Sequence, residues 1–324
     1  MSFAMGLIGN EHGSMTEEQR HTLADYWKGQ VNWDVPMADY CTFRAGGRVD
    51  ALVTVSSCPE LEQLVQFLRE QKISWRVIGR GSNILVSGLG YGGVLILLGG
   101  EFSTIQGDEE PDERSGKRTI RVGAGCSVSK LVSWCTQNSL TGLEFMAGIP
   151  GSVGGAVYMN AGAWGKEFGD CLVEASFVDR VGQFQHVAAS ELVFSYRKMN
   201  PLNSALTDAV IVGISLSLLT GRQREIVEKC RENLAKRNEK QPTGMASAGS
   251  FFKNPAGDSA GRLIDSAGLK GLRRGNAMVS MKHANFIVNT GQATADDIID
   301  LMNEIREKVY AASGILLEPE VQLL

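Results

Sequence analysis

The spacing of apolar residues predicts alternating strands and helices in the first third of the chain. Residues 61–68 place apolar side chains at i, i+3, i+4 and i+7, which is one face of an amphipathic helix. Runs rich in β-branched residues at 49–55 and 75–78 flank this helix and indicate strands. A strand–helix–strand unit is therefore predicted, followed by another strand at 94–98.

The middle of the chain is mainly strand-like. Residues 119–122 and 173–178 are short apolar runs, and apolar residues alternate along 209–219, as in a strand with one buried face. Residues 128–135 are predicted to form a helix. The charged stretch 106–117 resembles an acidic patch, but its turn residues favour a solvated hairpin loop.

The pattern changes near residue 220, where strong helices begin. The first helix is predicted at 225–237, and the second starts at Thr294, where the sequence Thr-Ala-Asp-Asp resembles a capping box. The side chains expected to face inward on the first helix are Ile226, Val227, Cys230 and Leu234. We expect an N-terminal mobile arm at 1–31 that ends in a short helix, one domain at 32–220 and a second at 221–324.

Composition and charge indicate a cytoplasmic globular protein. The 324 residues carry a net charge of −4 and 43% hydrophobic residues, so neither nucleic acid nor an anionic membrane is an expected partner. No apolar run is long enough to span a bilayer, and the N-terminus lacks a secretory signal. The six cysteines form no CxxC pair, so reduced thiols and no metal site are expected.

A glycine-rich turn directly follows the strand at 75–78. Its backbone N–H groups and polar side chains suit a pyrophosphate, although most such turns are only turns. No helix is signalled behind it, so it is not a Rossmann fingerprint. The turn consists of Gly79, Arg80, Gly81, Ser82 and Asn83.

A second glycine-rich stretch lies about 70 residues further on and continues to Asn160-Ala161-Gly162. So many glycines are costly in regular structure, which favours either close approach to a flat, extended cofactor or a tight packing crossover. Two such loops together favour a dinucleotide that is not bound in the Rossmann manner. The candidate cofactor residues here are Gly148, Ile149, Gly151, Ser152, Gly154 and Gly155.

Three polar residues outside the loops are candidates for chemistry. Arg197 can hold a carboxylate through two parallel hydrogen bonds, or form a surface ion pair. Ser250 lies between Gly249 and two Phe residues without a nucleophile elbow, so it is a proton donor or a hydrogen-bonding group. Glu320 lies near the chain end, where a solvated acid is the usual outcome.

Taken in order, the motifs resemble one enzyme family from about residue 42 to the C-terminus. They are TFRAGG, VIGRGSN, GIPGSVGGAVYMNAGA, SYR, SAGSFFKNP, AGRLIDSAGLKG, KHANFIVN and LEPEV. This series is similar to that of the UDP-N-acetylenolpyruvoylglucosamine reductases. The short segment between Tyr196 and Gln241 resembles the compact type II subtype of that family, which lacks an inserted loop over the substrate.

The resemblance implies an α+β fold: a two-lobed FAD-binding domain of the vanillyl-alcohol-oxidase (PCMH) type, with lobes at about 32–100 and 101–220, plus a C-terminal α+β substrate-binding domain. It implies noncovalent FAD, with the pyrophosphate at the first glycine turn and the flavin along the second. Arg197, Ser250 and Glu320 match the family's catalytic residues. Tyr196, Lys240, Asn254 and Arg262 are the substrate-binding candidates.

The implied reaction has two halves. NADPH reduces FAD, and UDP-N-acetylglucosamine enolpyruvate then accepts a hydride from flavin N5 at C3 and a proton from Ser250 at C2, giving UDP-N-acetylmuramate for peptidoglycan synthesis. A fixed cation such as Arg197 would stabilise the charge that forms on the substrate carboxylate. We expect a monomer and no metal.

Two alternatives and two departures accompany this interpretation. A sugar or lactone oxidase of the same fold remains an alternative, although residues 79–90 contain no His for covalent flavin attachment. A non-catalytic nucleotide-binding module would explain the glycines but not the three polar residues. Met199 stands where the family often has Ser, and the chain ends four residues after Glu320.

Overall fold

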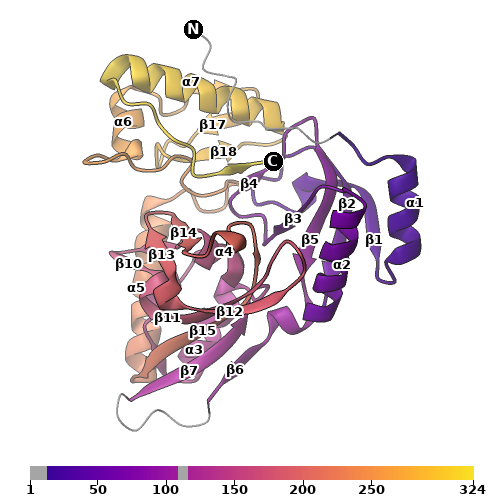
Figure 1. Cartoon of the computed structure of the whole chain (residues 1–324). Coiled ribbons are helices and arrows are strands. Elements are labelled where there is room, and N and C mark those ends of the chain that lie inside the picture. Colours follow the sequence, from indigo (N-terminus) through magenta and orange to yellow (C-terminus); the bar gives the residue numbers. More distant parts are fainter. Residues whose placement is uncertain (1–12, 109–115) are drawn as a thin grey trace.

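The computed structural model describes residues 13–108 and 116–324, arranged as two lobes and a C-terminal domain (Figure 1). The first lobe is a sheet of order β1-β2-β5-β3, in which β5 pairs parallel to both β2 and β3. These strands are β1 (Val31–Pro36), β2 (Arg48–Val55), β3 (Trp75–Ile78) and β5 (Tyr91–Leu98). Helix α2 (Cys58–Glu70) joins β2 to β3 and buries the predicted apolar face. The strand–helix–strand prediction is confirmed.

The described part of the N-terminal segment is packed against the first lobe, contrary to the expected mobile arm. Helix α1 (Glu17–Tyr26) buries Leu23 completely in the same core as α2, and Trp27 follows it inward. Arg20 Nη2 lies 3.1 Å from the nearly buried Asp50. Only a few apolar side chains attach this helix to the lobe, so the sequence pattern did not predict that it packs there. Residues 1–12 lie outside the described residues.

The second lobe is an antiparallel sheet of order β12-β11-β15-β7-β6, with β8 also paired to β15. Its strands are β6 (Ile105–Gly107), β7 (Lys117–Gly123), β8 (Leu140–Thr141), β11 (Leu172–Val178), β12 (Phe184–Ala188) and β15 (Val210–Thr220). Helix α3 (Val128–Gln137) packs beside it. The three predicted strands and the helix are confirmed. β6 and β7 pair as a hairpin, but most of its predicted loop, residues 109–115, lies outside the described residues.

Helix α5 (Gln223–Lys240) packs against the second lobe, next to α3 (Figure 1). Its Asn233 is buried and donates from Nδ2 to the Glu144 carbonyl oxygen at 2.8 Å. The expected inward position of Leu234 is wrong: this side chain is 42% exposed and lines the cleft described below. The domain boundary expected near residue 220 assigned α5 to the C-terminal domain, whereas the helix packs against the second lobe.

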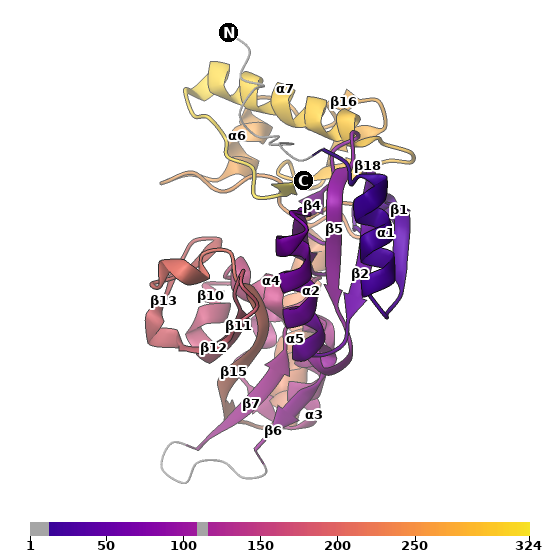
Figure 2. The same cartoon turned by 45° about the vertical axis from the view of Figure 1, so that its right-hand side comes forward.

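The C-terminal domain combines a small sheet with two helices. Its elements are α6 (Ala260–Ser266), β16 (Arg273–Arg274), β17 (Ala277–Val279), β18 (Ile287–Asn289) and α7 (Ala295–Ser313). Thr294 forms the predicted capping box at the start of α7. The chain then returns to the first lobe, where β19 (Gln322–Leu323) pairs parallel with β4 (Ile84–Leu85). Figure 2 shows the C-terminus between this domain and the first lobe.

No helix among the described residues is long and apolar enough to cross a bilayer, and no group of His, Cys, Asp or Glu in the same part of the chain has the arrangement of a metal site. The six cysteines are free thiols. Burial raises the pKa of the Cys58 and Cys135 thiols to about 12, so these thiols stay protonated and unreactive.

Candidate active site

A cleft of about 1400 Å³ lies where both lobes meet the C-terminal domain. The lining includes both glycine-rich loops and the side chains of Arg197, Lys240, Ser250 and Glu320. The structure therefore brings together segments from every part of the fold in a space large enough for a dinucleotide and a substrate.

The first glycine turn connects β3 to β4 and has almost no room for side chains. Gly81 has φ +63°, and a Cβ there would lie 1.9 Å from the Tyr40 carbonyl oxygen. At Gly79 a Cβ would lie 2.3 Å from Ser152 Oγ. Glycine is therefore required at Gly81, whereas a side chain at Gly79 would have to displace the Ser152 hydroxyl.

The second glycine stretch faces the first. Ser82 Oγ donates to the Pro150 carbonyl oxygen at 3.3 Å. Ser152 then caps helix α4 (Val153–Tyr158), so Gly154 and Gly155 lie in a helix despite their low propensity. Gly154 N donates to the Ala124 carbonyl oxygen at 2.8 Å, which packs α4 closely on the second lobe. These glycines have two explanations: they line the cleft, and they let α4 pack closely on the second lobe.

Arg197 lies at the tip of a two-stranded hairpin formed by β13 (Leu192–Ser195) and β14 (Lys198–Pro201). Its backbone is left-handed, with φ +58°, a strained conformation that is common at functional sites. Its Nε lies 2.9 Å from Glu320 Oε1. The N–H is not aligned as a hydrogen bond, so Nε is a buried donor without a hydrogen-bond partner among the described residues.

Ser250 and Glu320 lie on two chain segments that are held together by backbone hydrogen bonds. Glu320 N donates to the Phe251 carbonyl oxygen at 2.8 Å, and Phe251 N donates to the Asn285 carbonyl oxygen at 2.8 Å. The Asn83 amide donates to the Glu320 carbonyl oxygen at 3.0 Å. Since Phe251 is fully buried, the positions of Ser250 and Glu320 are fixed by the core and by the first glycine turn.

Burial raises the pKa of Glu320, while the Arg197 and Lys253 cations oppose the rise. Lys253 itself pairs with the more exposed Glu318. Glu320 therefore holds a proton more readily than an exposed glutamate. At the same time it can orient Arg197.

The sequence pattern did not signal Arg237, which is a further cation in the cleft. It lies in the last turn of α5 beside Gly148, where an added Cβ would be 3.1 Å from Arg237 Cδ. Its Nε is buried without a hydrogen-bond partner among the described residues. Burial, and then the nearby Arg197, lower the pKa of Arg237, which indicates a site suited to an anionic ligand.

Trp164 is another cleft residue that the sequence did not single out. Its side chain is 45% exposed and lines the cleft. Lys240 Nζ lies 5.9 Å from the centroid of its ring. Trp164 and the predicted contact Lys240 thus form one surface of the cleft.

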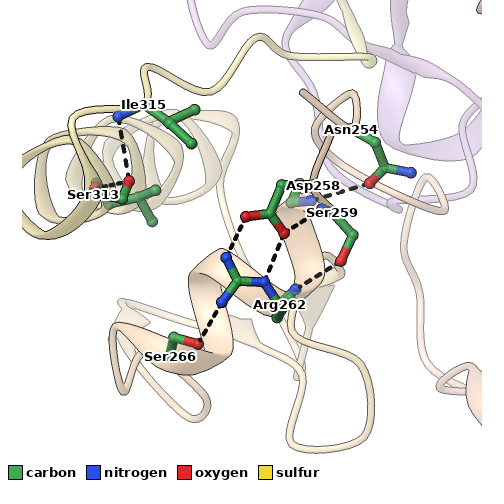
Figure 3. A network of polar contacts seen from close by, with 9 residues as sticks. Asn254, Asp258, Ser259, Arg262, Ser266, Ser313 and Ile315 are labelled. Carbon is green, nitrogen blue, oxygen red and sulfur yellow. Dashed lines mark hydrogen bonds and ion pairs between the residues drawn. The ribbon is translucent and has the colours of Figure 1, made fainter. Parts of the chain in front are cut away.

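The other substrate-binding candidates lie outside the cleft lining. Tyr196 Oη accepts from Asn254 N at 3.4 Å, which links the Arg197 hairpin to the C-terminal domain. Arg262 is engaged in a local network instead: its Nε donates to Asp258 Oδ1 at 2.6 Å, and its Nη1 donates to Ser266 Oγ at 3.4 Å (Figure 3). Arg262 lowers the pKa of Asp258 to about 2.

Met199, the departure noted in the sequence, does not face the cleft. It pairs with Phe194 across the hairpin, and its side chain is buried in the core of the second lobe. A methionine here contributes packing.

The two-lobed fold and its cleft define an FAD-dependent oxidoreductase. Residues 49–188 match the family model described as FAD binding domain. Residues 241–324 match the model described as UDP-N-acetylenolpyruvoylglucosamine reductase, C-terminal domain.

Full-length relatives point to the same family. The chain is 42% identical to the UDP-N-acetylenolpyruvoylglucosamine reductase of Syntrophus aciditrophicus, over 91% of this chain and 92% of that one. It is 40% identical to that of Desulfosudis oleivorans, over 96% and 99%. The crystal structure of the Thermus caldophilus reductase aligns with a TM-score of 0.75 at 38% identity, covering 91% of this chain and 98% of that one. The chain belongs to the UDP-N-acetylenolpyruvoylglucosamine reductase family.

Proposed function

We propose that the protein reduces UDP-N-acetylglucosamine enolpyruvate to UDP-N-acetylmuramate with electrons from NADPH, in the cytoplasm and as a monomer, for peptidoglycan synthesis. One observation carries the proposal: Arg197, Ser250 and Glu320 line the same cleft as both glycine loops. A fixed cation, a hydroxyl and a buried acid are the groups that this reduction requires.

The cleft fits a noncovalent FAD. The turn Gly79–Asn83 would hold the pyrophosphate, and the stretch 148–155 would line the ring. Arg237 is half-buried beside Gly148, and its buried Nε has no hydrogen-bond partner in the part of the chain that the structure describes, so it suits the negative charge of a reduced flavin. When bound, FAD supplies the hydride that goes to C3 of the substrate's vinyl group.

Arg197 is proposed to stabilise the charge that this hydride leaves behind. Negative charge develops at C2 and spreads into the adjacent carboxylate, where a guanidinium binds most strongly. Glu320, 2.9 Å from Arg197 Nε, orients the guanidinium toward it. Because burial raises the pKa of Glu320, this acid can also share a proton with the doubly charged intermediate.

Ser250 is proposed to complete the reduction. Its O–H bond breaks as a new C–H bond forms at C2, and the hydroxyl regains its proton from solvent. An unperturbed hydroxyl is a weak acid, but the carbanionic C2 is basic enough to take its proton.

The nucleotide end of the substrate is proposed to lie over Lys240 and Trp164. A lysine provides a point charge for a diphosphate, and an exposed indole provides a surface for a ring. Tyr196 and Asn254, already in contact with each other, are proposed to close over this end. The family resemblance implies a contact from Arg262, but its local bonds to Asp258 and Ser266 hold it outside the cleft lining. We therefore expect little contribution from it to substrate binding, which is tested below.

The decisive experiment follows NADPH oxidation anaerobically with and without UDP-N-acetylglucosamine enolpyruvate, and identifies the product by mass. We expect a yellow protein whose NADPH consumption depends on the substrate. A yellow protein that ignores this substrate and oxidises sugars or lactones with oxygen would replace the proposal with the oxidase alternative. A protein that remains colourless after reconstitution with FAD would favour a nucleotide-binding module.

A further inference from the structure

Asn160 is a buried polar residue to which the proposed reaction assigns no role. Its side chain is completely buried, and its backbone is left-handed, with φ +40°. It lies at the end of the second glycine stretch, and the next two residues line the cleft. Burial of an amide in a strained backbone is costly unless its hydrogen bonds are made.

All the polar groups of the Asn160 side chain are satisfied. Nδ2 donates to Glu167 Oε2 at 2.6 Å and to the Ser195 carbonyl oxygen at 3.1 Å. Oδ1 accepts from Gly169 N at 3.1 Å. Ser195 is two residues before Arg197, so one amide links the loop that lines the cleft to the hairpin of the proposed catalytic arginine.

The hairpin has few other attachments near its tip. β13 and β14 pair only with each other among the described strands. Phe194 packs over Gly169, while Ser195 and Tyr196 are exposed. Met199, two residues after Arg197, anchors β14 in the core of the second lobe. At the turn itself, the Tyr196–Asn254 contact, the ion pair to Glu320 and the bond from Asn160 hold the chain.

We propose that Asn160 is a positioning residue that sets the location of Arg197 relative to the flavin site. This role rests on the proposed function, because Arg197 acts in the reaction with the enolpyruvyl substrate and not in the reaction with NADPH. Loss of the Asn160–Ser195 bond would therefore slow one half-reaction and leave the other nearly intact.

The test measures each half-reaction anaerobically in FAD-loaded protein. For Asn160→Asp we expect reoxidation by the substrate to slow by about 100-fold, as for a misplaced catalytic group. Flavin reduction by NADPH should stay within about threefold, since transition-state interactions with Arg197 are absent there. Asn160→Gly removes the same bonds and tolerates φ +40° without strain, so it provides the test if the aspartate variant fails to fold.

A double variant separates positioning from stability. In Asn160→Asp/Glu167→Gln, the amide introduced at position 167 can donate to position 160, but Ser195 still lacks its donor. We expect recovery of the melting temperature without recovery of reoxidation. Recovery of both would overturn the positioning role.

A readout independent of turnover is hydrogen exchange of the hairpin. Amides of residues 192–201 should exchange faster in Asn160→Gly, while those of β15 stay protected. Asn233→Ala, which removes another buried amide bond, is the matched control and should change neither hairpin exchange nor the ratio of the half-reactions. Unchanged hairpin exchange or equal slowing of both half-reactions in Asn160→Gly would refute the inference. If wild type itself is not reoxidised by the substrate, the proposed function fails instead.

Discussion

The site has two halves that are built differently. Ser250 and Glu320 lie on segments joined by backbone hydrogen bonds and anchored by the buried Phe251 and Phe252. Arg197 lies on a separate two-stranded hairpin, in a left-handed backbone, and is held mainly by side chains. The proposed proton donor and the half-buried acid are therefore held by the core behind them, whereas the proposed cation lies on a hairpin with fewer such supports.

This difference would suit the proposed reaction, in which two ligands use one cleft in turn. A rigid half keeps the proton donor in a constant position relative to the flavin. In the proposed reaction, an adjustable Arg197 would let NADPH enter and would then approach the substrate carboxylate, with Glu320 beside it. Hairpins held by few buried contacts open at low free-energy cost.

The largest expected effect comes from the rigid half. Ser250→Ala should slow reoxidation of the reduced flavin by about 10³–10⁴-fold, the upper range for loss of a general acid. Reduction by NADPH should be nearly unchanged, because it requires no proton at C2. Anaerobic rapid mixing measures both steps, with Ser217→Ala on β15 as the control. Equal slowing of both steps would mean that Ser250 shapes the cleft and does not donate the proton.

The adjustable half is tested by Arg197→Lys. Lysine keeps the charge but loses the planar fork, so reoxidation should slow by about 10²–10³-fold, as when one aligned donor is removed. Arg222→Lys, at the exposed start of α5, is the control. Near-normal turnover in Arg197→Lys would show that charge alone suffices.

The free energy of unfolding should also respond differently to substitutions in the two halves of the site. Phe252→Ala should lower the free energy of unfolding by about 3–5 kcal/mol, as for a buried aromatic. Phe194→Ala in the hairpin should lower it by about 1–2 kcal/mol, since that ring is only partly buried. Urea unfolding measures both. A larger loss at Phe194 would contradict the division into a rigid and an adjustable half.

Glu320→Gln should alter how stability depends on pH. The folded-state pKa of Glu320 is raised by burial above its ordinary value of 4.5, so the native state favours the neutral acid. As pH rises from 4.5 through the raised pKa, wild type should lose stability relative to Glu320→Gln. Urea unfolding of both proteins across this range measures the difference. An opposite trend would mean that the ion pair with Arg197 outweighs burial.

The smallest effect is expected for Arg262→Ala. Arg262 is exposed and paired with Asp258, so the stability of the protein should change little. The KM for the substrate should change little. A tenfold rise in KM, against an unchanged value in Lys229→Ala on α5, would show that Arg262 reaches the substrate after all.

The sequence predicted the elements of the fold because their periodicity is local. The strands at 75–78 and 209–219 and the capping box at Thr294 depend on nearby residues only. On α5 the predicted inward position of Ile226 is confirmed, but that of Leu234 is wrong, because the buried side chain there is an amide, Asn233, that satisfies a carbonyl of a distant segment. The packing of α1 was missed for a related reason, since few anchors hold that helix.

The sequence pointed to candidate site residues where motifs contained them. Arg197, Ser250 and Glu320 were named from the family resemblance, and all three line the cleft. Arg237 and Asn160 were missed, because an arginine in a basic helix and an asparagine after a glycine loop look ordinary in sequence. Their roles depend on long-range contacts: Gly148 for Arg237, and Ser195 for Asn160.

The most direct test of the two-part site is hydrogen exchange of the FAD-loaded wild-type protein with and without the enolpyruvyl substrate. Without substrate, amides of residues 192–201 should exchange much faster than those of Phe251, Lys253 and Glu320. Addition of substrate should protect the hairpin and leave the other three amides unchanged. Equal protection of both halves before substrate is added, or a hairpin that does not respond to it, would contradict the account.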